Sequence, residues 1–161
     1  MTEDSFKEII ISIIPTLYRV AVCYLPDEED RKDAVQETLR RSWEKKDTIQ
    51  HEEYVKTWII RILINVCHDI GRKQKKLITI PIERMNSRKI EESSDHSDLK
   101  LALMSLHERE RIPIILYYLE GYNTHQVSQI LRIPAGTVKT RLKRGRDQLR
   151  IMLHEGVFEE G

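Results

Sequence analysis

The chain has 161 residues, of which 27 are Lys or Arg and 26 are Asp or Glu, so its net charge at pH 7 is only +1. No apolar run has the length of a membrane-spanning helix, and the acidic start MTEDSFKE lacks the positive segment of a secretory signal. We therefore expect a cytoplasmic protein. Cys23 and Cys67 are too far apart for a metal motif or a disulfide framework, and we expect them to be reduced core residues.

Two helices are predicted at the beginning of the chain. Over residues 5–24 the apolar residues recur at spacings of three and four, which indicates a helix with a broad buried face. Pro15 lacks a backbone donor and is expected to kink this helix or divide it into two. After Pro26 and a cluster of acids, which favour a helix N-terminus, a second helix is expected to run to about Trp43.

The second predicted helix has a polar face made by Asp33, Gln36, Glu37 and Arg40, which share one side at helical spacing. On its other side, apolar residues can turn inward. Taken alone, such a stripe is a solvated helix face more often than a docking surface.

A polar loop, residues 45–53, precedes a third predicted helix over residues 54–70. Ile49 is an apolar residue within that loop, and Gly71 is the expected C-terminal cap of the helix. Asn65 falls late in this helix, where its amide could read an exposed base or bond to the backbone of a neighbour.

The middle of the chain divides it into two domains. Residues 75–97 lose helical periodicity and contain Pro, Ser and mixed charge, which is typical of a linker. We therefore predict an all-α protein with two small helical domains, a three- to four-helix domain over residues 1–74 and a four-helix domain over residues 98–161.

The second domain is predicted to end in a helix-turn-helix. Leucines over residues 99–106 form one amphipathic helix, and another begins near Ile112 with Pro113 in its first turn. Thr124 is the expected cap of a third short helix, and Pro134 the expected first turn of a fourth. Two short helices joined by a tight turn favour a DNA-binding module.

The last predicted helix is strongly basic. The segment 132–150 has seven Lys or Arg against the single acid Asp147, and Lys139, Thr140, Lys143 and Arg144 project outward near its start. A bare run of this kind is usually a solvated face. Here the lack of acids and the preceding helix and turn favour insertion into the major groove of DNA.

A second basic segment, residues 56–76, has six Lys or Arg against Asp69 alone. Two basic patches on tethered domains indicate contact with two places on one nucleic acid.

With these motifs in view, the chain resembles the extracytoplasmic-function (group IV) sigma factors of the sigma-70 family, from near Phe6 to near Leu153. The resemblance rests on four stretches in this order: DAVQET at 33–38, TWIIRILINVCHDIGRK at 57–73, the run from Glu110 to Pro134, and GTVKTRLKRGRDQLR at 136–150.

The resemblance implies which residues bind the polymerase. In the family the DAVQE helix docks on the β′ clamp helices of core RNA polymerase, so Asp33, Gln36 and Glu37 become core contacts. The family's second domain also meets the β flap.

The resemblance also implies the promoter contacts. The first domain would hold a flipped base of the minus-ten element in the loop before the third helix, with phosphates held nearby. Its implied contacts are Ile49, Arg61, Asn65, Arg72 and Lys73. The last helix would read the minus-thirty-five element, with Lys139, Thr140, Lys143 and Arg144 as base-side contacts and Arg141 and Arg146 as phosphate contacts.

The family resemblance further implies an anti-sigma factor as partner, which can be membrane-bound, and no cofactor, metal or small-molecule substrate. The alternative is a two-domain helix-turn-helix transcriptional regulator with an N-terminal sensing domain, which would need neither the DAVQET helix nor a second basic patch. A nucleic-acid-modifying enzyme would need an acidic metal cluster or a zinc deaminase signature, and the sequence has neither.

Three residues depart from the family pattern in the helix-turn-helix. Ser128 replaces the usual small alanine of the first helix, which is a mild change. Arg132 occupies a turn position where glycine is common, and a left-handed backbone there would cost about 1 kcal/mol. Gln126 stands where glutamate is common, so a salt bridge made from that position is lost.

Overall fold

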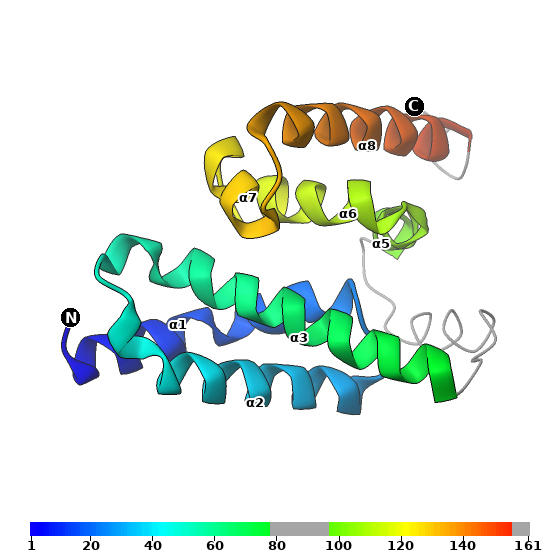
Figure 1. Ribbon diagram of the computed structural model, residues 1–161. Coiled ribbons are helices and arrows are strands. Elements are labelled where there is room, and N and C mark those ends of the chain that lie inside the picture. Colours follow the sequence, from blue (N-terminus) through cyan, green and yellow to red (C-terminus); the bar gives the residue numbers. More distant parts are fainter. Residues whose placement is uncertain (78–96, 156–161) are drawn as a thin grey trace. The chain divides into compact units, whose positions relative to one another are not determined.

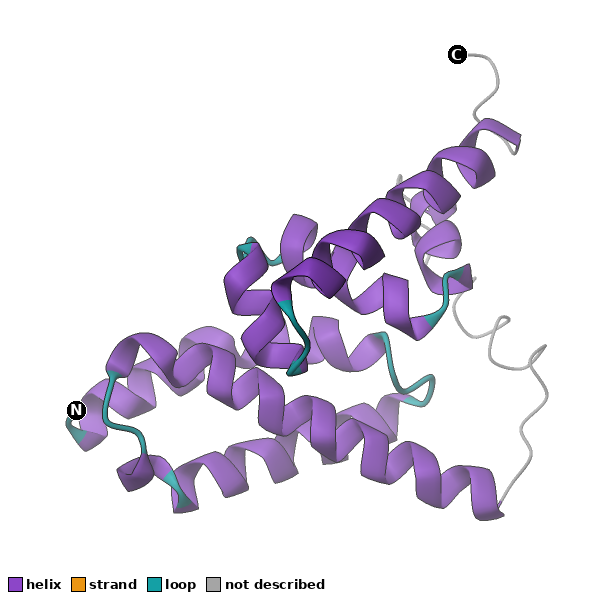
Figure 2. Cartoon of the chain, turned by 45° about the horizontal axis from the view of Figure 1, so that its top comes forward, coloured by secondary structure: helices purple, strands orange, loops and turns teal. Residues whose placement is uncertain are grey.

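The computed structural model describes residues 1–77 and 97–155, and every regular element in these ranges is helical (Figure 2). The chain divides into two compact units, one built mainly on each range. The predicted all-α, two-unit fold is thereby confirmed. Most of the predicted linker lies outside the described residues, and the boundaries at 74 and 98 stay a prediction. None of the described helices is both long enough and apolar enough to cross a membrane.

The first unit consists of three helices that pack on one another, α1 (Glu3–Val22), α2 (Glu28–Glu44) and α3 (Val55–Leu77) (Figure 1). Side chains before the first two helices satisfy backbone donors that would otherwise lack a partner. The Thr2 hydroxyl accepts from the Ser5 amide at 3.1 Å, and the Asp27 carboxylate accepts from the Glu29 amide at 3.2 Å.

Both α1 and α3 continue past a residue that was predicted to interrupt or end the helix. Pro15 does not divide α1, which continues as one helix to Val22 with Ile13 and Leu17 buried on either side of the proline, and a kink at Pro15 stays a prediction. Gly71 does not cap α3, which runs six residues further to Leu77. The residues after Gly71 are mostly Arg, Lys and Gln, which favour a helix, and nothing forces the glycine into a left-handed conformation.

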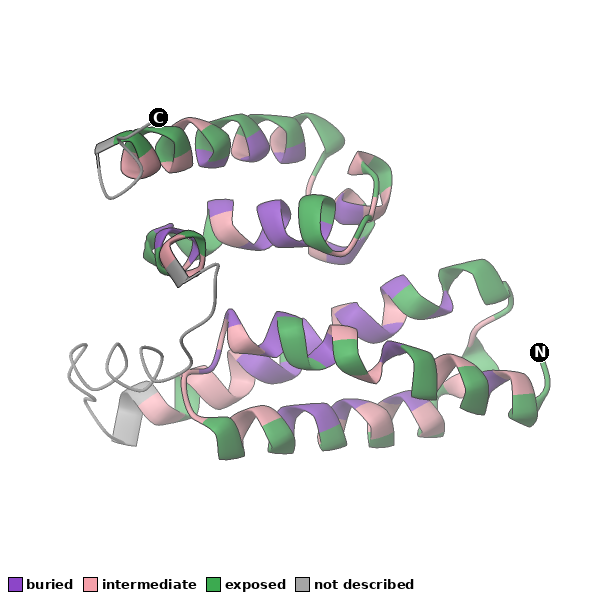
Figure 3. Cartoon of the chain, turned by 180° about the vertical axis from the view of Figure 1, so that it is seen from behind, coloured by how far each residue is buried: buried purple, intermediate pink, exposed green. Residues whose placement is uncertain are grey.

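The core of the first unit is apolar and closely packed. The inward faces of its helices carry the buried residues, drawn purple in Figure 3. Phe6 on α1 meets Trp43 on α2 with ring centroids 5.9 Å apart. Full burial of a side chain of the size of Phe6, Leu17 or Ile59 contributes about 1.5–3 kcal/mol. Cys23 and Cys67 are both buried and are not joined in a disulfide, in agreement with the core role predicted for them.

The second unit contains the helix-turn-helix. Its elements are α5 (Ser97–Ser105), α6 (Glu108–Ile114), the π-helical turn η3 (Ile115–Leu119), α7 (Thr124–Leu131) and α8 (Ala135–Glu155). Both α5 and α6 pack against α8, and α6 continues directly into η3. Pro113 lies one turn further into its helix than predicted, because α6 begins at Glu108 and not near Ile112.

The cap of α7 is one residue earlier than predicted. Asn123, not Thr124, accepts from the Gln126 amide at 2.8 Å, and the Gln126 side chain accepts from the Asn123 amide at 2.9 Å. This reciprocal pair is a capping box, which satisfies two backbone donors at once. The glutamine that departs from the family pattern therefore has a local role in starting the helix.

The turn between α7 and α8 depends on a left-handed residue. Arg132 has φ 56° and ψ 47°, which confirms the left-handed conformation considered from the sequence. For a residue other than glycine this conformation costs about 1 kcal/mol. Pro134 immediately precedes α8 and does not lie in its first turn. Its carbonyl accepts from the Val138 amide at 3.1 Å.

Gly145 sets the distance between α6 and α8. A Cβ atom added at this position would lie 2.8 Å from Cγ1 and 3.1 Å from Cδ1 of Ile114, which is itself buried. Only a glycine allows the two helices to approach this closely without moving Ile114.

We predict that Gly145→Ala destabilises the protein. Overpacking of this kind typically costs about 1–3 kcal/mol, which exceeds the gain of about 1 kcal/mol from the higher helix propensity of alanine. Gly136→Ala is the matched control in the same helix, because nothing lies within 4 Å of its added Cβ, and it should leave stability equal or higher. Urea unfolding followed by circular dichroism compares the two. Equal midpoints would mean that Ile114 moves aside freely.

Candidate nucleic-acid interface

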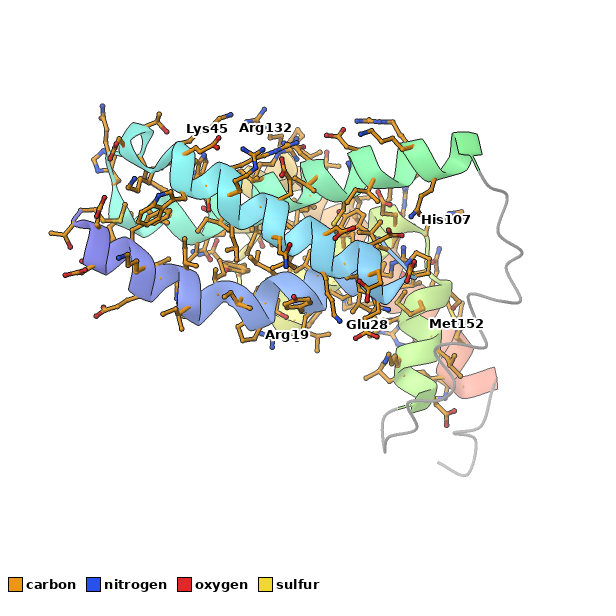
Figure 4. The ribbon with its side chains drawn as sticks, turned by 90° about the horizontal axis from the view of Figure 1, so that it is seen from below. Arg19, Glu28, Lys45, His107, Arg132 and Met152 are labelled. Atoms are coloured by element: carbon orange, nitrogen blue, oxygen red, sulfur yellow. The ribbon has the colours of Figure 1, made fainter. Side chains whose placement is uncertain are left out.

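The polar stripe predicted on the second helix lies on the outer face of α2. Asp33 and Gln36 are exposed, and Glu37 is half-buried, while Ala34 and Val35 on the opposite face are fully buried. In Figure 4, Glu28 and Lys45 mark the two ends of this helix. Because α2 packs on its neighbours mainly through its apolar face, Asp33 and Gln36 remain available for another surface.

Glu37 differs from its neighbours because it holds two arginines. Its carboxylate accepts from Arg40 Nη2 at 2.6 Å, from Arg40 Nε at 3.0 Å and from Arg41 Nε at 2.7 Å. These hydrogen bonds, from Arg40 first and Arg41 second, lower the pKa of Glu37 to about 2. Arg40 Nη1 also donates to Glu44 at 2.7 Å, which completes a chain of ion pairs along the helix. Glu37 therefore holds the arginine side chains of this face in position and is itself part of the face.

A groove with a volume of about 560 Å³ lies between α2 and α3. It is lined from α2 by Asp30, Asp33, Glu37 and Arg41, and from α3 by Val66, Asp69, Ile70, Arg72 and Lys73. The structure thus brings two predicted polymerase contacts and two predicted minus-ten contacts to one groove. Within it Arg72 forms an ion pair with Asp69, and the Gln74 amide donates to Asp30.

Three of the predicted minus-ten contacts share one side of α3. Arg61, Asn65 and Arg72 are separated by four and seven residues, a spacing that returns to the same side of a helix. Asn65 and Arg72 are exposed, and Arg61 is half-buried. An amide between two guanidinium groups on one helix face suits a nucleic-acid strand, since the arginines can hold phosphates and the amide can meet a base edge.

The loop before α3 contains two short 3-10 turns, η1 (Lys46–Thr48) and η2 (Glu52–Tyr54), with the half-buried Ile49 between them.

Lys46 fastens this loop to the rest of the first unit. Its ammonium lies 4.1 Å from the centre of the Trp43 ring, 3.4 Å from the Trp43 carbonyl oxygen and 4.0 Å from Glu3. The Lys46 side chain is only 17% exposed. Sequence reasoning missed this contact, although a lysine three residues after an aromatic residue was its visible signal.

The basic surface of the second unit lies on α8. Val138 and Leu142 are buried, whereas Arg141 is half-buried and the other predicted contacts are exposed, namely Lys139, Thr140, Lys143, Arg144 and Arg146. The predicted separation of an apolar and a basic face is therefore present in the structure.

Several of these side chains have partners within the protein. Thr140 donates its hydroxyl to the Gly136 carbonyl at 3.1 Å, and Lys143 pairs with Asp147 at 3.1 Å. The hydrogen bond from Lys143 is the main cause of the lowered pKa of Asp147. Both partners are exposed, so water screens this ion pair, and Lys143 can exchange Asp147 for a DNA group at little cost.

Comparisons with known families identify both units. Residues 9–77 match the family described as "Sigma-70 region 2", and residues 96–149 match the family described as "Sigma-70, region 4". The two matches occur in the order and at the places that the motifs predicted.

Individual relatives agree with this assignment. The chain is 33% identical over 138 residues to RNA polymerase sigma factor SigV of Bacillus subtilis, an alignment that covers 84% of this chain and 83% of SigV. It is 27% identical to ECF RNA polymerase sigma factor SigM of the same organism, over 99% of this chain and all of SigM.

Solved structures agree as well. The sigma factor RpoE of Bartonella quintana, crystallised with the anti-sigma factor NepR, superimposes with a TM-score of 0.75 at 26% identity over 92% of this chain and 96% of RpoE. CnrH, in complex with the cytosolic domain of CnrY, superimposes with a TM-score of 0.74 at 20% identity over 97% of this chain and 92% of that chain, a likeness of fold alone. The matched regions, the relatives and the fold together show that this chain belongs to the extracytoplasmic-function sigma factors of the sigma-70 family.

Proposed function

We propose that this chain binds core RNA polymerase through α2 and recognises promoters through α3 and the preceding loop in the first unit and through α8 in the second. This assignment rests on one observation, the separation of an apolar face from a polar or charged face on each of these helices. In each of them an apolar face is buried within its unit, and a charged or polar face is left outside.

The polymerase contact is assigned to the α2 stripe. Asp33 and Gln36 are exposed and short, so they can meet a partner helix without losing much side-chain freedom. Glu37 contributes less directly, because its carboxylate already holds Arg40 and Arg41. We propose that it keeps the charges of this face in place for the β′ clamp helices.

The minus-ten contact is assigned to the face of α3 that carries Arg61, Asn65 and Arg72, together with Lys73 and Ile49. A base inside a duplex hides its Watson–Crick edge, so an amide can read it only after the base has left the stack. The loop held by Lys46 provides the neighbouring surface. Ile49 offers such a base an apolar contact where an aromatic ring would offer stacking.

The minus-thirty-five contact is assigned to α8. Lys139, Thr140, Lys143 and Arg144 lie in its first half and can reach base edges in the major groove, and Arg141 and Arg146 are assigned to phosphates. The number of cations predicts strong dependence of this contact on salt, since each phosphate neutralised releases counterions.

We further propose an anti-sigma factor as a regulatory partner, because RpoE of Bartonella quintana was solved with one. The family is not one of enzymes, and this chain is proposed to act in the cytoplasm with the chemistry supplied by the polymerase. The alternative of a regulator with a sensing domain is not favoured, since the first unit matches sigma-70 region 2.

Run-off transcription tests the proposed function. Purified core polymerase is combined with the chain and a library of promoter fragments, and the transcript starts are mapped against core polymerase alone. We expect starts at a fixed distance downstream of two shared elements. Failure to bind core polymerase, or starts unchanged by addition of the chain, would refute the proposal.

Replacing Asp33 and Gln36 together by alanine is expected to weaken binding to core polymerase. Loss of two exposed contacts should cost about 1–2 kcal/mol, a factor of roughly 5–30 in the dissociation constant, while circular dichroism stays unchanged. Glu8→Ala, at an exposed carboxylate on α1, is the control. The docking assignment is wrong if the double variant binds core polymerase as tightly as the control.

Asn65→Ala is expected to impair the open complex and to leave the closed complex nearly unchanged. The loss of one hydrogen-bonded contact to a base should cost about 1–3 kcal/mol. Because a melted strand still has to be read, the loss should persist on templates already opened across the minus-ten element. Permanganate footprinting on duplex templates and binding to pre-melted ones measure both effects. If the variant matches the wild type in both measurements, Asn65 has only a structural role.

A further inference from the structure

Tyr118 and Arg146 form a contact between two elements of the second unit. Arg146 Nη1, on α8, donates a hydrogen bond to the Tyr118 hydroxyl oxygen, on η3, at 3.1 Å. The two residues are 28 positions apart in the chain, so this contact requires the tertiary fold and is not a pairing within one helix. Both side chains are exposed, Tyr118 by 50%.

The backbone around this contact explains why it forms. Gly145 lets α8 approach Ile114 at the end of α6, and Arg146 is the next residue of α8. Tyr118 follows Ile114 by one turn, in the π-helical segment η3, and lies near the same side. A π-helical turn is an uncommon element that occurs frequently at functional sites. The Tyr117 ring meets the Tyr118 ring edge-on at 4.9 Å and limits its movement.

The chemistry of the pair suits an anion. A phenol can accept from Arg146 and still donate its own proton, and the guanidinium keeps further N–H groups. The hydrogen-bonded partner of Arg146 is neutral, so the hydrogen bond orients the positive charge without neutralising it. The nearby carboxylate of Asp147 forms its ion pairs with Lys143 and Arg150, and Arg146 is the smallest of the causes that lower the pKa of Asp147. An oriented guanidinium beside a free hydroxyl donor matches the oxygens of a phosphodiester.

We propose that Tyr118 and Arg146 together form one phosphate-binding site on the DNA-facing side of the second unit. Tyr118 holds the guanidinium in place and donates its own proton to the same phosphate. This inference rests on the proposed function, because it adds a contact residue outside α8 to the surface assigned to the minus-thirty-five element. A side chain held in advance loses less freedom on binding than a free arginine, so the site binds the DNA backbone more tightly.

Tyr118→Phe tests this site, because it removes one oxygen and keeps the ring and its packing. The variant is assembled with core polymerase, and binding is measured on duplexes with the preferred and with a scrambled upstream element. We expect about 3- to 10-fold weaker binding to both, because a phosphate contact does not depend on sequence. Tyr117→Phe removes the neighbouring hydroxyl and should bind as the wild type does.

A double variant shows whether the two residues act on one phosphate. Arg146→Ala should weaken binding to both duplexes and reduce the salt slope by about 1. Adding Tyr118→Phe to Arg146→Ala should cause a smaller loss than Tyr118→Phe causes alone, because only the direct contact of the hydroxyl with the phosphate is left to remove. Wild-type affinity in Tyr118→Phe, or full additivity of the two losses, would overturn the shared site.

The outcomes also separate this inference from the proposed function. If wild-type holoenzyme shows no preference for the promoter over the scrambled duplex, the assignment of α8 to promoter reading fails. If that preference holds and Arg146→Ala weakens binding while Tyr118→Phe does not, the proposed function stands and only the role of Tyr118 is wrong.

Discussion

Each unit of this chain is so small that each of its helices can bury only one of its faces. Each unit has fewer than about 80 described residues, so its core is modest and its stability depends on complete burial of a single apolar stripe per helix. In α2 that stripe includes Ala34 and Val35, and in α8 it includes Val138 and Leu142. The opposite faces contribute little to the core, and this leaves them free for a polymerase or for DNA.

The outer faces are not arrays of free charges. Glu37 holds Arg40 and Arg41, and Asp147 holds Lys143, so several of the groups assigned to binding already have a partner in the isolated chain. The net charge of +1 reflects 27 Lys or Arg against 26 Asp or Glu, and internal pairing uses part of each set. Exposed ion pairs are weak in water, and a binding partner can therefore replace the internal one at a low cost.

The irregular parts of the second unit gather around the surface assigned to DNA. Arg132 is left-handed in the turn before α8, and η3 is π-helical before α7. Gly145 allows the close approach of α6 and α8 that brings Tyr118 to Arg146. Gly145 serves the packing of α6 on α8 and at the same time determines where Arg146 lies.

The sequence by itself determined the all-α class, the two units, the helix-turn-helix and which face of α2 and α8 is polar, because helical periodicity and charge are local properties of the chain. It misjudged Gly71, and of the two outcomes predicted at Pro15 a division of the helix did not occur, since both residue types can either break a helix or continue one and the packing of neighbouring turns decides between these outcomes. Only the tertiary structure revealed that Asp33 and Lys73 line one groove and that Tyr118 meets Arg146. These contacts join different elements, and their distances depend on helix packing, which no local pattern specifies.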